Sequence, residues 1–232
     1  MTALRLFGGG TRASVIVDFV RWRLADHFEL QGFYDDNPGA GEGLDLARLG
    51  GIADGLRDMR GSDAAAVIAL GTYASWRACE VLHDLRQRNV AVANLISPMA
   101  FISPSAELGD GALILDGVFI GARARIGALL TANASAIIEH DTVIGHNVML
   151  GSGAAIAGFA RVEDHCFIGT NATVLPNVVI GSGTLLAAGS AATKNLPQSV
   201  IAIGSPAKAV RGVGQKDEVP SPDRMGRLPN LD

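Results

Sequence analysis

The sequence predicts an α/β domain with a small parallel sheet, followed by a parallel β-helix built from six-residue repeats. Three observations support this fold class. Residues 4–96 alternate between short apolar runs and segments with helical spacing, whereas residues 102–191 divide into fifteen consecutive hexads without an insertion. The 29 glycines and the low aromatic content of 5% are typical of a tightly stacked repeat rather than of a core of bulky side chains.

The first part of the chain contains four apolar runs and two helical segments. The expected strands are residues 3–9, 28–36, 65–71 and 90–96, and the expected helices are residues 15–28 and 73–89. Strand, helix and strand in this order form a parallel sheet, which binds ligands where its strands end. The residues at these ends are Gly8, Gly9, Gly10, Asp35, Asp36, Gly71 and Thr72.

The hexads have the form Ile/Leu/Val, Gly, any, any, small, any. Position one is Ile, Leu or Val except in the hexad that begins at Ala132, and position five is always Ala, Val, Leu, Thr, Ser or Cys. A helix with 3.6 residues per turn would lose register with a strict period of six. A coil of three short strands keeps that register. Position one then points into the interior, position five fits the corners, and the chain stacks on itself every three hexads.

Charge and composition argue against several functional classes. The formal net charge of −4 gives no electrostatic reason to expect nucleic acid or an anionic membrane as a partner. The two cysteines, Cys79 and Cys166, make no disulfide framework, and no stretch reaches the roughly 18 apolar residues of a membrane span. Residues 1–10 lack the layout of a cleavable signal peptide, so a reduced, cytoplasmic setting is expected.

Two histidines, His140 and His146, lie six residues apart within the repeat. Both occupy position three of their hexads, so they project from neighbouring faces of the coil, which argues against joint ligation of one metal within the chain. Gly158 lies one coil away from His140, roughly 4.8 Å along the axis, and its backbone N–H is not shielded by a side chain. A base beside an oxyanion donor is the geometry that acyl transfer requires.

The whole chain resembles the hexapeptide-repeat acyltransferases, and among them the sugar O/N-acyltransferases. These comprise the sialic-acid O-acetyltransferase type and the N-acetyltransferases of nucleotide-linked 4-amino-4,6-dideoxy sugars. The resemblance rests on the segments FGGGTRA, GFYDDN, IALGT, IIEHDTVIG and IGSPAKAV. It implies a left-handed coil over residues 98–212, preceded by a small Rossmann-like nucleotide/sugar-binding domain at residues 1–97 and followed by a polar tail at residues 213–232.

The resemblance also implies catalytic roles. His140 matches the general base that deprotonates the acceptor, and Gly158 matches the glycine whose N–H contacts the acetyl oxygen. Asp141 matches an acid that orients the imidazole, with Glu139 as the alternative. Where related amino-sugar N-acetyltransferases carry a second pocket histidine, this chain has Met149.

Three further residues of the repeat are interpreted from their positions. His146 is interpreted as a residue at the rim of the pocket, and His165 is expected to be exposed. Asn133 matches an asparagine that lines the acceptor pocket of the family, although a turn residue would explain it nearly as well.

Acetyl-CoA is the cofactor that the resemblance implies, bound between the adjacent subunits of a homotrimer. A column of third-position residues, small apart from its first member, would line the groove for the pantetheine arm: Asp116, Ala134, Ser152, Thr170 and Ala188. The closing segment places Lys208, with Lys194 and Arg211, near the nucleotide end of the cofactor. Phosphate contact and simple solvated charge are both open interpretations of these cations.

The expected acceptor is a nucleotide-linked amino sugar held by the first domain. Gly8 and Gly10 would present backbone N–H groups to phosphate, and Asp35 and Asp36 would lie near the base and the ribose. Family members usually have Gly-His after the glycines, where this chain has Thr11 and Arg12, and Arg12 could hold a diphosphate directly. The alternative is a purely structural role, in which the glycines allow a tight turn and the two acids cap a loop.

N-acetylation is the preferred reaction because an amine loses its proton more readily than a hydroxyl. O-acetylation of a sialic-acid-type sugar is the second interpretation. A zinc-dependent hydratase of the γ-type carbonic anhydrases requires two histidines five residues apart, a spacing that this sequence lacks. A noncatalytic scaffold would leave His140 and Gly158 without a role.

Overall fold

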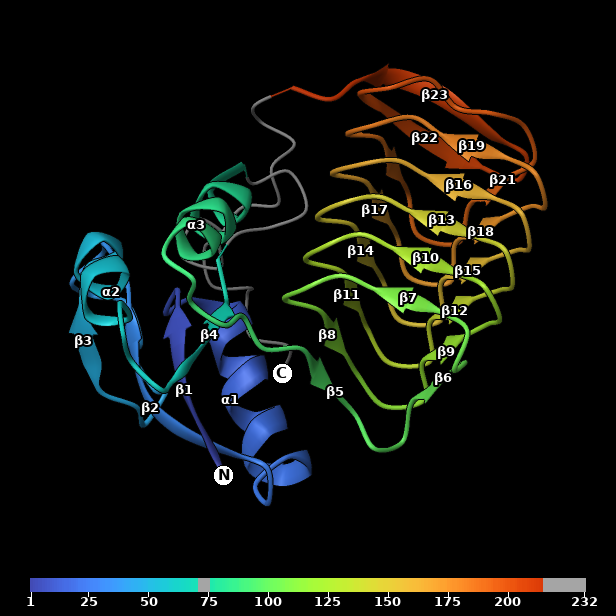
Figure 1. Ribbon diagram of the computed structural model, residues 1–232. Helices are drawn as coiled ribbons and strands as arrows, with labels where there is room; N and C mark the ends of the chain where they lie inside the picture. The colour runs from blue at the N-terminus through green and yellow to red at the C-terminus, as the bar shows by residue number, and fades with distance from the viewer. Residues whose placement is uncertain (71–75, 215–232) are drawn as a thin grey trace, which may run out of the picture.

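The computed structural model describes residues 1–70 and 76–214. Gly71 and Thr72, and the polar tail from residue 215 onward, lie outside the described residues. The described chain forms an α/β domain that stands beside a coil of stacked strands (Figure 1). None of the described helices is long and apolar enough to cross a membrane.

The α/β domain is a parallel sheet covered by helices. Its strands are β1 (Thr2–Phe7), β2 (Phe28–Tyr34), β3 (Arg48–Gly50) and β4 (Ala65–Ile68), in the order β3-β2-β1-β4. Its helices are α1 (Thr11–Arg23), α2 (Ile52–Asp58) and α3 (Trp76–Gln87). All neighbouring strands pair in parallel, as the alternation of strands and helices predicts.

The structure corrects several expected elements of this domain. Helix α1 begins at Thr11 and not at residue 15. Gly10, which has an extended backbone conformation, is its N-cap. The strand β3 and the helix α2 were not expected, since both are short and the strand is largely exposed. Residues 90–96 do not form a strand of this sheet. Val92 makes one isolated bridge, and Leu95–Ile96 is β5, which pairs with β8 in the coil.

The second part is a left-handed coil with three faces, and on each face the strands of successive coils pair in parallel (Figure 1). Each face is named here after one of its strands. The β11 face contains β5 (Leu95–Ile96), β8 (Leu113–Ile114), β11 (Thr131–Ala132), β14 (Met149–Leu150), β17 (Phe167–Ile168), β20 (Leu185–Leu186), β22 (Val200–Gly204) and the antiparallel β23 (Ala207–Gly212). The β12 face contains β6 (Phe101–Ile102), β9 (Phe119–Ile120), β12 (Ile137–Ile138), β15 (Ala155–Ile156), β18 (Thr173–Val174) and β21 (Ala191–Ala192). The β13 face contains β7 (Glu107–Leu108), β10 (Arg125–Ile126), β13 (Val143–Ile144), β16 (Arg161–Val162) and β19 (Val179–Ile180).

The hexad pattern accounts for the interior of the coil. From residue 112 to residue 192, positions one and five are buried and form one continuous apolar cluster, apart from the buried hydroxyls at position five. From β6 to β21 each strand consists of position six and the following position one, so these strands are shorter than a whole hexad. Position four has a positive φ in every hexad from residues 108–113 onward, which explains why Gly and Asn are frequent there.

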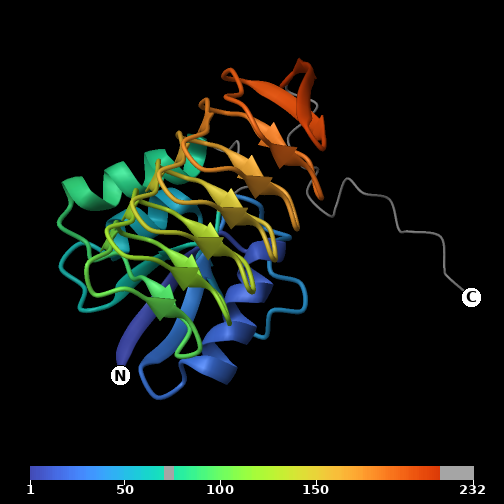
Figure 2. The same ribbon diagram turned by 90° about the vertical axis from the view of Figure 1, so that its right-hand side faces the viewer.

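The α/β domain packs against the β11 face. Leu113 joins the apolar cluster of α1, and Leu129 joins the cluster of α3. Ion pairs flank this contact: Arg23 Nη2 lies 2.6 Å from Asp116 Oδ2 on one side, and Arg86 Nη2 lies 2.7 Å from an Asp110 oxygen on the other. The corner between the β12 and β13 faces is therefore on the side of the coil away from the α/β domain. In Figure 2 the α/β domain accordingly lies behind the coil.

Candidate active site

His140 lies in the turn that joins β12 to β13, on the corner away from the α/β domain. Its side chain is 49% exposed, and its Nδ1 lies 2.9 Å from Asp141 Oδ2. A carboxylate accepts hydrogen bonds, so Nδ1 carries the proton of the neutral ring and Nε2 keeps its lone pair. Nε2 is therefore the ring nitrogen that can accept a proton.

Asp141 is itself held by Arg123, one coil earlier. Arg123 donates from Nε to Oδ1 and from Nη2 to Oδ2, both at 2.7 Å. The hydrogen bonds from Arg123 and then from His140 lower the pKa of Asp141 to about 2, so this carboxylate is ionised at neutral pH. Among the described residues it is Asp141, and not Glu139, that contacts the imidazole. Arg123 was not expected from the sequence, although its place 18 residues before Asp141 puts it in the same column.

Gly158 lies directly against the His140 ring, as the stacking of the hexads predicts. The backbone N–H of Phe159 donates to the His140 carbonyl at 3.2 Å, which fixes the register of the two coils. A Cβ built on Gly158 would lie 2.8 Å from Cε1 of His140 and 2.9 Å from its Nε2. Only glycine fits here without moving the ring, and its backbone stays next to the base.

The N–H of Gly158 has no acceptor among the described residues. The next corner of the coil shows one way in which such a group can be satisfied: the N–H of Ala128 donates to Nδ1 of His146, one coil later, at 2.9 Å. Pro176 stands one coil after Gly158 and has no side-chain acceptor. The Gly158 N–H therefore remains available to a bound oxygen atom.

The second histidine, His146, lies on a different corner from His140. Its ring Nδ1 accepts a hydrogen bond from the Ala128 N–H, and its backbone N–H donates to Asp164 Oδ1 at 2.6 Å. His165 is partly buried and not exposed as expected, because the ring of Trp76, at the start of α3, lies against it, tilted by 43° and with ring centroids 4.0 Å apart. This burial lowers the pKa of His165. Among the described residues, no group of three or more His, Cys, Asp or Glu side chains could hold a metal ion.

Phe159 forms an apolar wall beside the candidate base. Its ring meets the His140 imidazole edge to face, with centroids 5.2 Å apart. Phe159 is 58% exposed although it is a large apolar residue, and its φ is 62°. An exposed phenylalanine in a left-handed turn is unusual, and it shields one side of the imidazole from water.

The expected cofactor column lies on the corner between the β11 and β12 faces. Thr170 and Ala188 are exposed there, and the Gly189 N–H donates to the Thr170 carbonyl at 2.9 Å, so the two residues stack as expected. Lys208 is exposed in β23, at the far end of the coil. Gly158 is on a different corner, separated from this column by the β12 face. Within one chain the structure does not bring these residues together.

The expected nucleotide-binding residues surround the carboxyl ends of β1 and β2. The Gly8 N–H donates to the Tyr34 carbonyl at 2.8 Å, and Asp35 Oδ2 accepts the Gly9 N–H at 2.7 Å. Asp36 Oδ1 accepts the N–H of Ile52, the first residue of α2, at 2.8 Å. Both acids therefore stabilise loops of the free protein. Gly10 precedes α1, and a Cβ added there would meet no atom within 4 Å.

Arg12 reaches from α1 to the β11 face of the coil. Its Nη2 donates to Thr131 Oγ1 at 2.6 Å, while its Nε is buried and has no partner among the described residues. Burial lowers the pKa of Arg12 to about 10. The Arg12 guanidinium therefore has a buried hydrogen-bond donor that is not satisfied by the described residues. Asn133, on the same side of the coil, donates its Nδ2 to the Leu150 carbonyl at 2.8 Å.

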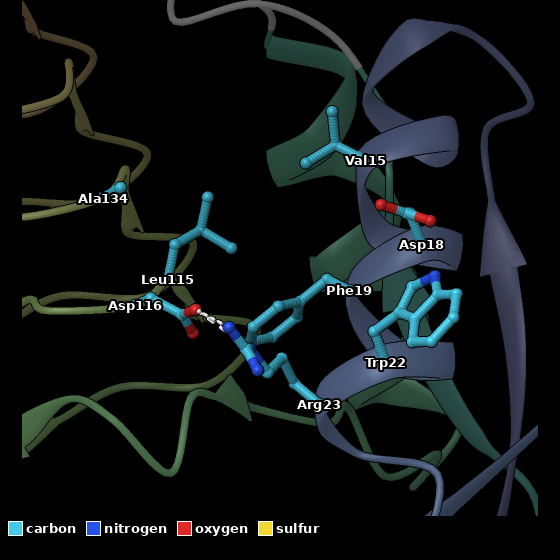
Figure 3. A pocket seen from close by; sticks show the side chains of 8 residues that line it. All are labelled: Val15, Asp18, Phe19, Trp22, Arg23, Leu115, Asp116 and Ala134. Carbon is cyan, nitrogen blue, oxygen red and sulfur yellow. Dashed lines mark hydrogen bonds and ion pairs between the residues drawn. The ribbon is translucent and has the colours of Figure 1, made fainter.

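A pocket of about 520 Å³ separates α1 from the coil (Figure 3). It is lined by Val15, Asp18, Phe19, Trp22, Arg23, Leu115, Asp116 and Ala134. In Figure 3, Arg23 reaches from α1 to Asp116, the first member of the expected cofactor column. A hydrogen bond from Ser97 and the Arg23 contact lower the pKa of Asp116. The sequence did not predict that α1 adjoins this column, because the contact depends on the packing of the two domains.

Comparisons with known proteins agree with the fold and extend over nearly the whole chain. Residues 159–191 match the family model described as bacterial transferase hexapeptide, six repeats. PerB from Caulobacter crescentus, solved in complex with CoA and GDP-perosamine, has a TM-score of 0.80 at 30% identity and covers 90% of this chain and 97% of that chain. WeeI from Acinetobacter baumannii has a TM-score of 0.77 at 25% identity, with 90% and 100% covered.

Similarity to curated sequences is more local. A putative acetyltransferase of Schizosaccharomyces pombe is 42% identical over 53 residues, which is 23% of this chain and 26% of that protein. A tetrahydropyridine-dicarboxylate N-acetyltransferase of Clostridium perfringens is 38% identical over 72 residues, with 28% and 30% covered. The chain thus spans less than a third of these relatives' length.

The repeat matches the bacterial transferase hexapeptide family, and the whole two-part fold is shared with PerB and WeeI. Within that family, the chain belongs to the hexapeptide-repeat sugar acyltransferases. The predicted fold class and family resemblance are both confirmed.

Proposed function

We propose that this protein transfers the acetyl group of acetyl-CoA to the amino group of a nucleotide-linked 4-amino-4,6-dideoxy sugar. The observation that carries the proposal is the contact between His140 and Gly158: an oriented imidazole lies against a bare backbone with a free N–H. The similarity to PerB, which was solved with CoA and GDP-perosamine, supports this class of substrate. Structures of histidine variants of GDP-perosamine N-acetyltransferase with the same two ligands give further support.

The reaction is an attack of the sugar amine on the thioester carbonyl carbon. As the C–N bond forms, Nε2 of His140 takes a proton from the amine, and the carbonyl oxygen gains negative charge. The Gly158 N–H donates to this oxyanion. When the tetrahedral intermediate collapses, the C–S bond breaks, CoA leaves as the thiolate, and the proton on His140 passes to the sulfur. Asp141 stabilises the imidazolium between these two steps.

The cofactor would bind along the column that contains Thr170 and Ala188, whose small side chains leave room for the pantetheine arm. Lys208, at the end of the coil, would contact its phosphate groups. Arg12 has a buried Nε without a partner and would hold the diphosphate of the acceptor. Gly8 and Gly10 would border that diphosphate, Asp35 and Asp36 the nucleoside, and Asn133 the sugar.

This site requires more than one chain. His140 lies on the corner opposite the β11 face, whereas Arg12 and Thr170 lie on or beside that face. A sugar held by the α/β domain of one chain would therefore meet the His140 of a neighbour. A homotrimer, with each groove closed by the next coil, satisfies this requirement.

Replacement of the base tests the proposed mechanism. We expect His140→Ala to reduce kcat by about 10²- to 10⁴-fold with acetyl-CoA and GDP-perosamine as substrates, while binding of CoA changes little. The matched control is His146→Asn, at the same position of the next hexad, where the amide oxygen can still accept the Ala128 N–H. Near wild-type turnover of His140→Ala would show that another group is the base.

Mixed oligomers test whether the site is shared between chains. His140→Ala and Arg12→Met chains, carrying different tags, are co-expressed and assayed at acceptor concentrations far below saturation. A shared site regains activity in the mixed oligomers, because one chain supplies His140 and its neighbour supplies Arg12. Activity no higher than that of the separate variants would place both residues in one chain's site.

O-acetylation of a sialic-acid-type sugar is the second candidate function. It is favoured by the loop-capping hydrogen bonds of Asp35 and Asp36, which give both acids a structural role without a nucleotide. Calorimetry with GDP, UDP and dTDP separates the two functions. Binding of one nucleotide supports the first proposal, and binding of none supports O-acetylation.

A further inference from the structure

The contact between Arg123 and Asp141 is a two-pronged ion pair that leads directly to the candidate base. Arg123 occupies position four of its hexad, and Asp141 occupies position four of the hexad one coil later. Both have a positive φ, of 58°, so both side chains leave the coil at equivalent left-handed turns. The guanidinium thereby meets the carboxylate side-on, with Nε and Nη2 each 2.7 Å from a different oxygen.

This geometry restricts the carboxylate more than a single contact would. Oδ1 is bound by Arg123, and Oδ2 is shared between Arg123 and Nδ1 of His140. Rotation of the carboxylate would break both guanidinium hydrogen bonds. The planar fork therefore fixes the direction from which Asp141 approaches the imidazole.

We propose that Arg123 is a positioning residue of the acetyl transfer: it holds Asp141 so that the proton of His140 stays on Nδ1 and Nε2 faces Gly158. This inference rests on the proposed function, because it assigns Arg123 a role through that base. Arg123 does not contact the reacting atoms. Its guanidinium offsets part of the Asp141 charge, so the main contribution of the fork is a single tautomer of the imidazole rather than a stronger base.

A purely structural role explains the contact less well. The Arg123 side chain is 66% exposed, and ion pairs at such exposure contribute little to stability. The same hexad carries a second exposed arginine, Arg125, which has no ion pair among the described residues. The two arginines thus form a matched pair for experiment, two residues apart and equal in charge.

The test combines imidazole NMR with kinetics on the full chain. Nitrogen-15 shifts of labelled histidines report the tautomer directly, and the His140→Ala spectrum assigns the relevant signal among the five histidines. We expect wild type and Arg125→Gln to show the Nδ1–H tautomer. Arg123→Gln should show a mixture of tautomers. Arg123→Lys keeps the charge without the fork, so its tautomer ratio should lie between the two.

The kinetic arm uses acetyl-CoA and GDP-perosamine. We expect kcat to fall about tenfold in Arg123→Gln, less in Arg123→Lys and not in Arg125→Gln, with KM for acetyl-CoA changed less than about twofold. An unchanged tautomer and kcat in Arg123→Gln would overturn the inference, as would a raised KM alone. If wild type transfers no acetyl group, the proposed function fails, while the tautomer ratios still decide the positioning role.

Discussion

Gly158 and His140 are in contact across adjacent coils, and the missing side chain of one makes room for the ring of the other. A Cβ at residue 158 would stand 2.8 Å from Cε1 and 2.9 Å from Nε2. The same backbone offers a free N–H beside the ring. One glycine thus both makes room for the imidazole and offers a hydrogen-bond donor beside it.

Gly158→Ala is expected to lower the acetyltransferase activity of the protein without unfolding it. Its φ lies outside the left-handed region, so alanine fits the backbone, but the new methyl group must displace the imidazole. A displacement of about 1 Å can lower kcat on the order of 100-fold. The measurements are kcat and the thermal midpoint. Gly39→Ala is the control, because its Cβ would meet only Asn37 Oδ1 at 3.5 Å. Wild-type kcat in Gly158→Ala would contradict the contact.

Asp141→Asn is expected to lower kcat by roughly 10- to 100-fold, because the amide can donate to Nδ1 and favour the wrong tautomer. Glu139→Gln is the matched control, since among the described residues Glu139 does not contact the ring. The assay is acetyl transfer under saturating acetyl-CoA. A larger loss in Glu139→Gln than in Asp141→Asn would show that Glu139 orients the base.

Arg12→Met is expected to separate ligand binding from stability. Burial lowers the pKa of Arg12 to about 10, which shows that its charge is held at a desolvation cost without a carboxylate partner. Methionine removes that cost but also removes the hydrogen bond to Thr131, so the thermal midpoint of the free protein should change little. Loss of a charged hydrogen bond to a diphosphate should weaken nucleotide-sugar binding by about 10- to 100-fold. Calorimetry with GDP-perosamine measures the second effect.

Arg21→Met provides the control for that experiment, since Arg21 lies on the same helix and pairs with exposed Asp45. It should leave GDP-perosamine binding unchanged. Unaltered binding in Arg12→Met would remove Arg12 from the anion site, and a large fall in its thermal midpoint would mean that its role is structural.

The free energy of unfolding should contain a small, pH-dependent contribution from Asp141. Its pKa of about 2 is below the value of about 3.9 for an aspartate in an unfolded chain, so the unfolded state binds more protons between these values. The stabilisation is therefore fully present above about pH 4 and is lost as the pH falls through about 2. We expect the difference in urea midpoint between wild type and Asp141→Asn to persist at pH 5 and to narrow from pH 4 to pH 2.

Circular dichroism at each pH measures these midpoints. Asp63→Asn, at an exposed loop residue without a side-chain ion pair among the described residues, is the control for loss of one carboxylate. A difference that disappears already at pH 5 would show that Arg123 does not hold Asp141 in its ionised form in solution.

The coil could be predicted because its sequence repeats regularly, whereas the irregular segments of the chain could not be predicted. A strict period of six fixes which residues stack, so the contact between His140 and Gly158 follows from counting. The strand β3 and the helix α2 are too short for any period to emerge, and the strand's exposed residues show no apolar alternation. The strand expected at residues 90–96 failed for another reason, because its last two residues pair with the coil instead of the sheet.

By itself, the sequence determined the coil, its columns and the separation of His140 from His146, because all three follow from the period of the chain. Only the tertiary structure decided that Asp141 rather than Glu139 contacts the imidazole, and that Arg123 grips it, because these depend on side-chain direction at left-handed turns. The tertiary structure also decided that the α/β domain covers the β11 face. Apolar contacts between residues far apart in the chain set that arrangement, and no local period records them.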